Sequence, residues 1–129
     1  MRILVAEDDL ASRRFLSQLM SSYGDCDQTV DGMEALDAIQ LAIEEGQPYG
    51  LICLDVMMPK LDGVKVLKAV RQMEKQHGIK GSSRSKVILT TALNPEFITH
   101  PLDPDVEMYA PKPLDAGKLD EMLRKMGLL

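Results

Sequence analysis

The chain has 129 residues, of which 45% are hydrophobic and 27% charged, and its formal net charge is −5. This length suits one domain with its own core, expected over residues 1–129, and the mixed composition excludes a disordered or fibrous protein. The acidic balance argues against nucleic-acid binding, which needs a clustered basic face. Because the sequence contains neither a signal peptide nor a long apolar span, we expect a cytoplasmic protein without membrane insertion.

The first apolar run extends from Arg2 to Ala6 and ends in Glu7-Asp8-Asp9. A short apolar run bounded by acids is typical of a buried strand. A helix is predicted from Leu10, because apolar residues then recur at every third or fourth position. Its expected inner face is Ala11, Phe15, Leu16, Leu19 and Met20. Asp9 is interpreted as the N-cap or first-turn acid of this helix.

A weaker strand is predicted from Cys26 to Val30, and its polar character suits the edge of a sheet. Asp31-Gly32 then turns the chain into a second helix. The apolar residues on one side of this helix are Leu36, Ile39 and Ile43. Cys26 and Cys53 are the two cysteines, and we expect both to be free and reduced.

The third apolar run, Leu51 to Leu54, ends abruptly in Asp55 and is followed by a turn that contains a proline. A continuous apolar run indicates a strand buried on both faces. In open parallel sheets the ligand crevice lies just beyond the carboxyl ends of the strands, where Asp55 would stand. Asp is also a favoured N-cap, so this residue alone does not distinguish a site from a helix cap.

A third helix is predicted after Asp62-Gly63, with Val66, Leu67, Val70 and Met73 on its inner face. Residues 75–86 are rich in Gly, Ser and basic side chains and are interpreted as a solvated loop. A fourth buried strand, Val87 to Leu89, follows this loop. It ends in Thr90-Thr91, so its last residues are again polar.

Three prolines lie in the next segment, at Pro95, Pro101 and Pro104. Pro95 can occupy a first helical turn, but the other two prevent continuation, so the helix expected here is short or absent. A short fifth strand is predicted from Met108 to Ala110. Because Pro111 lacks a backbone donor, we expect this strand to pair only partly.

The last predicted element is a helix from about Asp115, with inner residues Leu119, Met122, Leu123 and Met126. Strands that alternate with helices predict right-handed crossover connections and a parallel sheet covered on both faces, the α/β class. The carboxyl ends of parallel strands share one edge of the sheet, so the polar residues after them converge there. These residues are Glu7, Asp8, Asp55, Thr91 and Lys112.

In these residues the sequence resembles the response-regulator receiver family, the phosphoacceptor modules of two-component signalling, over essentially its whole length. Five motifs in order carry the resemblance: Ile3-Leu4-Val5-Ala6-Glu7-Asp8-Asp9, Asp31-Gly32-Met33-Glu34-Ala35-Leu36, Asp55-Val56-Met57-Met58-Pro59 with Asp62-Gly63, Thr91-Ala92, and Lys112-Pro113. The resemblance implies a flavodoxin-like, doubly wound sheet of five parallel strands in the order 2-1-3-4-5. It also implies a stand-alone, single-domain response regulator that is not an enzyme beyond its own phosphorylation and dephosphorylation.

The resemblance implies that Asp55 is the phosphorylated carboxylate. It implies that Asp8, Asp55 and the main-chain carbonyl of Met57 hold Mg²⁺, and that Glu7 helps through a water molecule. Mg²⁺ prefers hard oxygen ligands and keeps several waters, which suits such a partial protein shell. A divalent cation would also offset the repulsion between the clustered carboxylates.

The remaining roles implied by the resemblance belong to residues after the fourth and fifth strands. Lys112 would stabilise the phosphoryl oxygens together with Mg²⁺, and Thr91 would hydrogen-bond one of them. Thr91 and Tyr109 would form the conformational switch. Lys112-Pro113 would be a cis peptide, with Pro113 as the cis-proline.

The partners implied are a histidine kinase or a histidine phosphotransfer protein as donor, and an unidentified downstream protein that binds according to the phosphorylation state. The candidate output segment is Asn94 to Asp105. One alternative is a haloacid dehalogenase-like phosphohydrolase, which would need a second Asp where Met57 stands. Another is a pseudo-receiver that binds partners without phosphorylation, which would be expected to lack Asp55, Asp8 or Lys112.

The residues two positions after Asp55 and Thr91 are Met57 and Leu93, and both are apolar. An acid or an amide at these positions could orient the water that attacks the phosphoryl group. We therefore expect the phosphorylated form to be comparatively long-lived.

Overall fold

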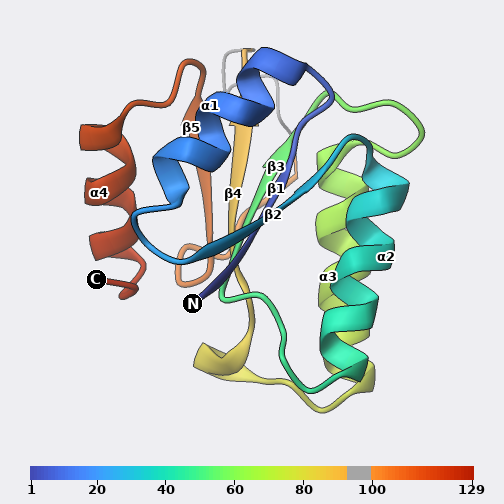
Figure 1. Ribbon diagram of the computed structural model, residues 1–129. Helices are drawn as coiled ribbons and strands as arrows, with labels where there is room; N and C mark the ends of the chain where they lie inside the picture. Colours follow the sequence, from blue (N-terminus) through green and yellow to red (C-terminus); the bar gives the residue numbers. More distant parts are fainter. Residues whose placement is uncertain (93–99) are drawn as a thin grey trace.

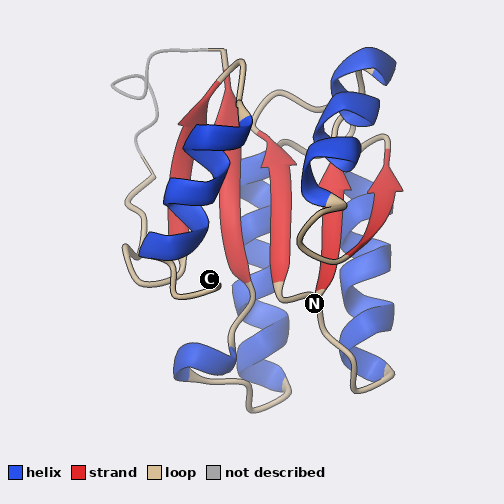
Figure 2. Cartoon of the chain, turned by 60° about the vertical axis from the view of Figure 1, so that its left-hand side comes forward, coloured by secondary structure: helices blue, strands red, loops and turns tan. Residues whose placement is uncertain are grey.

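The computed structural model describes residues 1–92 and 100–129. Within them are five strands, and helices separate all of these strands except the last two. The elements are β1 (Arg2–Ala6), α1 (Leu10–Met20), β2 (Asp25–Thr29), α2 (Gly32–Glu44), β3 (Leu51–Asp55), α3 (Gly63–Gln76), the 3₁₀ turn η1 (Gly81–Ser83), β4 (Lys86–Thr91), β5 (Glu107–Pro111) and α4 (Ala116–Lys125). All strand pairs are parallel, in the order β2-β1-β3-β4-β5 (Figure 2). The predicted fold class and strand order are confirmed.

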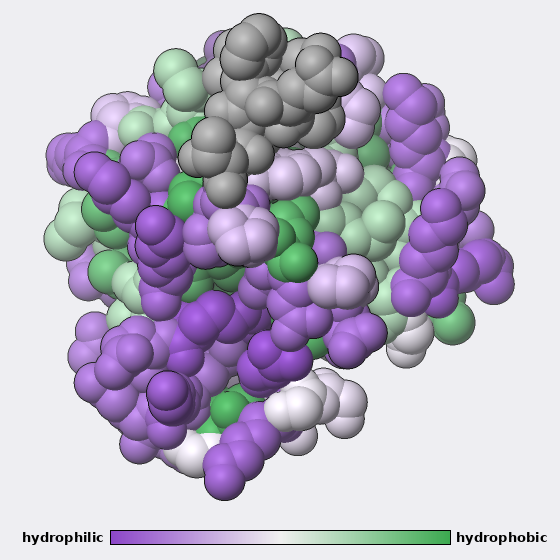
Figure 3. Space-filling view, turned by 180° about the vertical axis from the view of Figure 1, so that it is seen from behind, coloured by the Kyte–Doolittle hydropathy of each residue, from purple (hydrophilic) through white to green (hydrophobic). Residues whose placement is uncertain are grey.

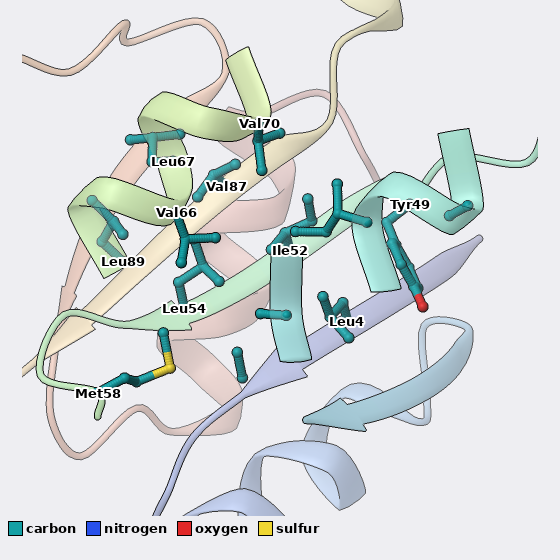
Figure 4. Close-up of a cluster of buried hydrophobic side chains, with 14 of the residues drawn as sticks. Leu4, Tyr49, Ile52, Leu54, Met58, Val66, Leu67, Val70, Val87 and Leu89 are labelled. Carbon is teal, nitrogen blue, oxygen red and sulfur yellow. The ribbon is translucent and has the colours of Figure 1, made fainter. Parts of the chain in front are cut away.

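The sheet lies between two helical layers, with α1 and α4 on one face and α2 and α3 on the other (Figures 1 and 2). Successive strand residues point to opposite faces, so each strand contributes to two separate cores. The core under α2 and α3 is shown in Figure 4 and includes Leu4, Ile52, Leu54, Val66, Leu67, Val70, Val87 and Leu89. The other core, under α1 and α4, includes Ile3, Val5, Leu16, Met20, Leu51, Cys53, Ile88, Leu119 and Leu123.

Each of the four α-helices in the described residues begins after an aspartate whose carboxylate accepts a hydrogen bond from the backbone N–H three residues later. An N-cap of this kind satisfies one of the unpaired donors of the first turn. The caps are Asp9, Asp31, Asp62 and Asp115. The N-cap interpretation of Asp9 is therefore confirmed.

The inner face of α1 is narrower than predicted. Leu16 and Met20 are buried, whereas Phe15 is 51% exposed and Ala11 lies on the surface. The side chains of successive helical residues point in directions about 100° apart. Phe15 therefore lies outside the buried stripe of α1 that contains its neighbour Leu16. The assignment of Ala11 and Phe15 to the inner face was wrong.

The connection from β4 to β5 contains no helix among its described residues, in agreement with the short or absent helix that was predicted. Residues 93–99, which include Pro95, lie outside the described part of the chain. The stretch 100–106 runs beside β5 on the outer side of the sheet (Figure 2). The described helices also include none that combines the length and the apolar character needed to cross a bilayer.

β5 pairs with β4 over its full length, so the prediction of partial pairing was wrong. Alternate residues of an edge strand direct their backbone groups toward the partner strand. The Lys112 N–H donates to the Thr91 carbonyl at 2.8 Å, which places the nitrogen of Pro111 on the outer side. Pro111 therefore costs the ladder no hydrogen bond, as is usual for proline in edge strands.

A buried ion cluster ties α3 to the start of β5. Arg71 contacts two carboxylates at 2.8 Å, from Nε to Glu107 and from Nη1 to Glu74. The exposed fractions of the side chains are 18% for Arg71, 2% for Glu74 and 6% for Glu107. Glu74 also accepts the Ser85 N–H at 2.7 Å, and Glu107 accepts the Asp103 N–H at 2.8 Å. The cluster thereby joins a helix, the loop before β4 and the turn before β5.

Candidate functional site

Three carboxylates meet at the carboxyl edge of the sheet. Glu7 follows β1 and Asp55 ends β3, and these two strands are neighbours. These two residues are almost fully buried, with 1% and 4% exposed, while Asp8 is exposed at the rim. One oxygen from each of the three carboxylates lies within 4.8 Å of the others. The topology therefore brings together the three acids that the sequence suggested as metal ligands.

Lys112 supplies the positive charge of this cluster. Its Nζ lies 3.0 Å from an oxygen of Glu7 and 3.0 Å from an oxygen of Asp55. The backbone of Lys112 is held by its N–H bond to the Thr91 carbonyl, and the Lys112–Pro113 peptide bond is cis. The end of β5 is thereby connected to the ends of β1 and β3 across the site.

The charges in the cluster do not balance. Burial raises the pKa of Glu7, the Lys112 hydrogen bond opposes this rise, and the charge of Asp55 adds to it. Burial alone would lower the pKa of Lys112, but its hydrogen bonds to Glu7 and Asp55 outweigh that effect and raise it. One ammonium thus faces three carboxylates, and the excess negative charge and all-oxygen donor set fit a hard divalent cation such as Mg²⁺.

Asp55 is not a helix cap, because Asp62 occupies the N-cap of α3. Its Oδ1 accepts the Met57 N–H at 3.2 Å, and the Met57 side chain is 65% exposed beside the site. Gly63 allows the start of α3 to lie close to the end of β3, since a Cβ at position 63 would lie 2.5 Å from the Asp55 carbonyl oxygen. The Asp62-Gly63 pair therefore positions the loop that carries Met57.

Thr91 and Tyr109 lie on neighbouring strands. Thr91 is fully buried at the end of β4, and its carbonyl accepts the Lys112 N–H. Tyr109 is half-buried. In the β4–β5 register it stands opposite Leu89, which precedes Thr91 by two residues on β4. Its hydroxyl donates to the His100 carbonyl at 3.3 Å, and burial, with the charge of Glu107, raises its pKa.

Leu93 and part of the candidate output segment, both named in the sequence analysis, cannot be located in the described structure. Leu93 lies outside the described residues, as does 94–99 of the candidate output segment. The hydrogen bond from Tyr109 reaches the first described residue after this gap, His100. Tyr109 therefore connects the sheet to the segment proposed for output.

Arg13 is a site residue that the sequence reasoning missed. From α1 its Nη1 donates to the Glu7 carbonyl at 3.0 Å and to the Asp8 carbonyl at 3.4 Å. It thereby holds the backbone that presents both acids. An arginine one turn into a surface helix has no distinctive sequence pattern, so only the folded geometry identifies this role.

A small, mostly apolar hollow opens beside Lys112, with a volume of about 100 Å³. Its lining combines α1 with the loop after β5: Ser12, Phe15, Leu16, Thr90, Lys112, Pro113 and Leu114. Leu10, Phe15 and Met57 are each at least 50% exposed. Apolar side chains therefore lie on the surface close to a charged, mostly buried site.

The family model described as "Response regulator receiver domain" matches residues 3–124. The response regulator MprA of Mycobacterium avium is 35% identical over 130 residues, covering 100% of this chain and 50% of the relative. The hybrid signal transduction histidine kinase L of Dictyostelium discoideum is 28% identical over 128 residues, covering 98% of this chain and 7% of the relative. The chain thus spans half of the first relative and a small part of the second.

Solved structures give the same fold. The receiver domain of the Arabidopsis thaliana histidine kinase CKI1, complexed with Mg²⁺ and BeF₃⁻, has a TM-score of 0.73 at 24% identity and covers 95% of this chain and 89% of its own. A co-crystal structure of the Saccharomyces cerevisiae phosphotransfer protein Ypd1 and the Ssk1 receiver domain gives 0.74 at 22% identity, covering 100% and 92%. At these identities the likeness establishes the fold alone.

Proposed function

The chain belongs to the response-regulator receiver family, and from this premise we propose that it accepts a phosphoryl group on Asp55. The observation that carries the proposal is the buried Asp55 carboxylate at a strand end, held 3.0 Å from the Lys112 ammonium beside two further acids. We also propose that the donor is a phosphohistidine of a histidine kinase or phosphotransfer protein. The co-crystal of Ypd1 with the Ssk1 receiver supports this class of donor.

In the proposed reaction an oxygen of Asp55 forms the bond to phosphorus while the phosphorus–nitrogen bond to the donor histidine breaks. The electron pair and a proton remain on the imidazole. Lys112 neutralises a phosphoryl oxygen, and the Thr91 hydroxyl hydrogen-bonds another once Asp55 is modified. Phosphoryl transfer of this kind depends mainly on positioning and on charge neutralisation.

Mg²⁺ is the cofactor that the donor set fits. Asp8 and Asp55 would bind it directly with the Met57 carbonyl, and Glu7 would act through a water molecule. When bound, Mg²⁺ supplies the positive charge that offsets the phosphoryl oxygens. The Mg²⁺ and BeF₃⁻ present with the CKI1 receiver support this choice.

The experiment that tests the proposal is labelling by a small phosphodonor, such as acetyl phosphate, followed by intact-protein mass spectrometry. We expect the mass of one phosphoryl group to be gained in Mg²⁺ and no gain after chelation with EDTA. Equal labelling with and without Mg²⁺ would contradict the assigned metal site. The haloacid dehalogenase alternative is set aside, since the chain belongs to another family and carries Met57 where that chemistry needs an acid.

The exposed apolar residues around the site are proposed to contact the protein donor. Phe15 lines the hollow beside Lys112 and is 51% exposed, which suits an anchor residue of an interface. We expect Phe15→Ala to slow phosphotransfer from a histidine phosphotransfer protein about tenfold. This is the effect of losing roughly 1.4 kcal/mol of binding free energy between the two proteins. The rate from a small phosphodonor should not change.

The control for Phe15→Ala is Leu41→Ala, because Leu41 is 55% exposed on α2, which covers the other face of the sheet. Both transfer rates are measured for each variant. If Phe15→Ala slows both donors equally, the side chain supports the site itself and not the docking of a protein. Equal slowing by Leu41→Ala would likewise count against a localised docking surface.

The lifetime of the phosphorylated form is proposed to depend on Met57. Its exposed apolar side chain stands two residues after Asp55 and has no group that can orient an attacking water. We expect Met57→Asn to accelerate phosphoryl loss several-fold in Mg²⁺ buffer after the donor is removed, measured by time-resolved mass spectrometry. Met57→Leu is the control and should match the wild type, whereas equal or slower loss in Met57→Asn would refute the idea.

The signal is proposed to leave through Thr91, Tyr109 and the connection that Tyr109 contacts. Drawing Thr91 toward the phosphoryl group would change the space available to the Tyr109 ring on the neighbouring strand. Because the Tyr109 hydroxyl bonds the His100 carbonyl, such a movement would alter residues 100–106. The downstream partner is then a protein that binds this surface in one phosphorylation state.

A further inference from the structure

The stretch from Arg71 to Lys86 has a charge opposite to that of the whole chain. It holds five of the 15 basic residues but only one of the 20 acidic residues, in a protein of net charge −5. That single acid, Glu74, is buried against Arg71 and does not reach the surface. Positive charge is therefore concentrated where α3 ends and β4 begins, at the edge of the sheet opposite the phosphorylation site.

The backbone shapes this basic stretch into a concave surface. A hollow of about 400 Å³ is lined by residues that include Lys75, Lys80 and Arg84, and a second hollow of about 240 Å³ adjoins it at Arg84 and includes Lys86. We call the pair the basic groove, defined by Lys75, Lys80, Arg84 and Lys86. Figure 3 views this side of the molecule, whose lower half is predominantly hydrophilic.

The cations of the basic groove differ in whether they are already paired. Arg84 contacts Asp103 at 3.1 Å, so the groove already holds one carboxylate of the chain itself. Within the described residues, no carboxylate lies within 4.0 Å of the ammonium groups of Lys75, Lys80 and Lys86. Lys75 and Lys80 are exposed. Three ammonium groups around one groove are thus available to an external anion.

The composition of the groove favours one class of anion. Asp105 and Glu107 also line the two hollows, and these carboxylates would repel the evenly spaced phosphates of a nucleic acid. Seven of the eleven residues that line the two hollows carry a charge, which suits a charged ligand better than a mostly apolar small molecule. Separate carboxylates on a flexible chain could reach the three lysines and avoid the two acids. We propose that the basic groove binds an acidic segment of a partner protein.

The proposal is tested by titrating a short synthetic peptide rich in Asp and Glu into the isotope-labelled full chain and following backbone amide signals by NMR. We expect saturable shifts around Lys75, Gly81 and Arg84 that weaken as salt is added. The Lys75→Gln/Lys80→Gln variant should bind about fivefold more weakly, since each exposed ion pair contributes little. The Lys118→Gln/Lys125→Gln variant removes the same charge from α4, on the other face, and should bind like the wild type.

Three outcomes would overturn the proposal. The first is that the shifts do not saturate or are centred on Lys112. The second is that both double variants weaken binding equally, which would indicate a general charge effect. The third is that an oligonucleotide or an anionic lipid vesicle of matched charge binds more tightly than the peptide. The result does not depend on phosphorylation of Asp55, so the two proposals fail independently.

Discussion

Asp55→Asn is expected to take up no phosphoryl group from a small phosphodonor in Mg²⁺, under conditions that label the wild type. The amide cannot replace the carboxylate as nucleophile, and loss of a nucleophile lowers rates by several orders of magnitude. In our proposal the neighbouring Glu7 acts on Mg²⁺ through a water molecule and stays bonded to Lys112, so it does not replace Asp55 as the acceptor. Intact-protein mass spectrometry measures the result directly.

The matched control for Asp55→Asn is Asp9→Asn. Asp9 is exposed, and its carboxylate caps α1 by accepting the Ser12 N–H at 2.8 Å, a role that asparagine also performs well. This variant loses the same charge close to the site and should be labelled like the wild type. Persistent labelling of Asp55→Asn would place the acceptor elsewhere. A wild type that is never labelled would favour the pseudo-receiver alternative.

Arg71→Met is expected to lower the free energy of unfolding by about 3–5 kcal/mol, the usual cost of removing one partner of a buried ion pair. Two carboxylates, Glu74 and Glu107, would remain buried without their cation. Methionine keeps most of the apolar stem, so the loss is assigned to charge and hydrogen bonding. Urea unfolding followed by circular dichroism measures the change.

Lys75→Met is the control for Arg71→Met, because it removes a positive charge from the exposed side of the same helix. Its effect should stay within about 0.5 kcal/mol. Adding Glu74→Gln and Glu107→Gln to Arg71→Met should restore part of the stability, since no uncompensated charge then remains. A loss in Arg71→Met no larger than that in Lys75→Met would show that the buried cluster contributes nothing to stability.

The sequence predicted the fold well because β1, β3 and β4 are short apolar runs that end in, or are followed at once by, a polar residue. The strand ends alone placed Glu7, Asp55 and Lys112 at one edge, and the structure gives the 3.0 Å contacts between them. These residues are far apart in the chain but follow strands of one parallel sheet. Topology was therefore sufficient to bring the charged groups of the site together.

The residues that escaped prediction are those whose role depends on tertiary contacts. Arg71 looks like any basic residue of an amphipathic helix, yet its partner Glu107 lies 36 positions away. Phe15 follows the helical period closely enough to be placed in the core, although the packing of α1 leaves it half exposed. The period of a helix fixes relative directions, but the depth at which the helix packs determines which side chains are covered.

The position of Pro111 has a consequence for how the protein behaves at high concentration. An open sheet edge with free N–H groups is a template on which strands of other molecules can add, the first step of aggregation. On the β5 edge Pro111 removes one of the outward donors, and on the β2 edge Asp25 and Asp27 present exposed negative charge. Both ends of the sheet are thus poorly suited to edge-to-edge growth.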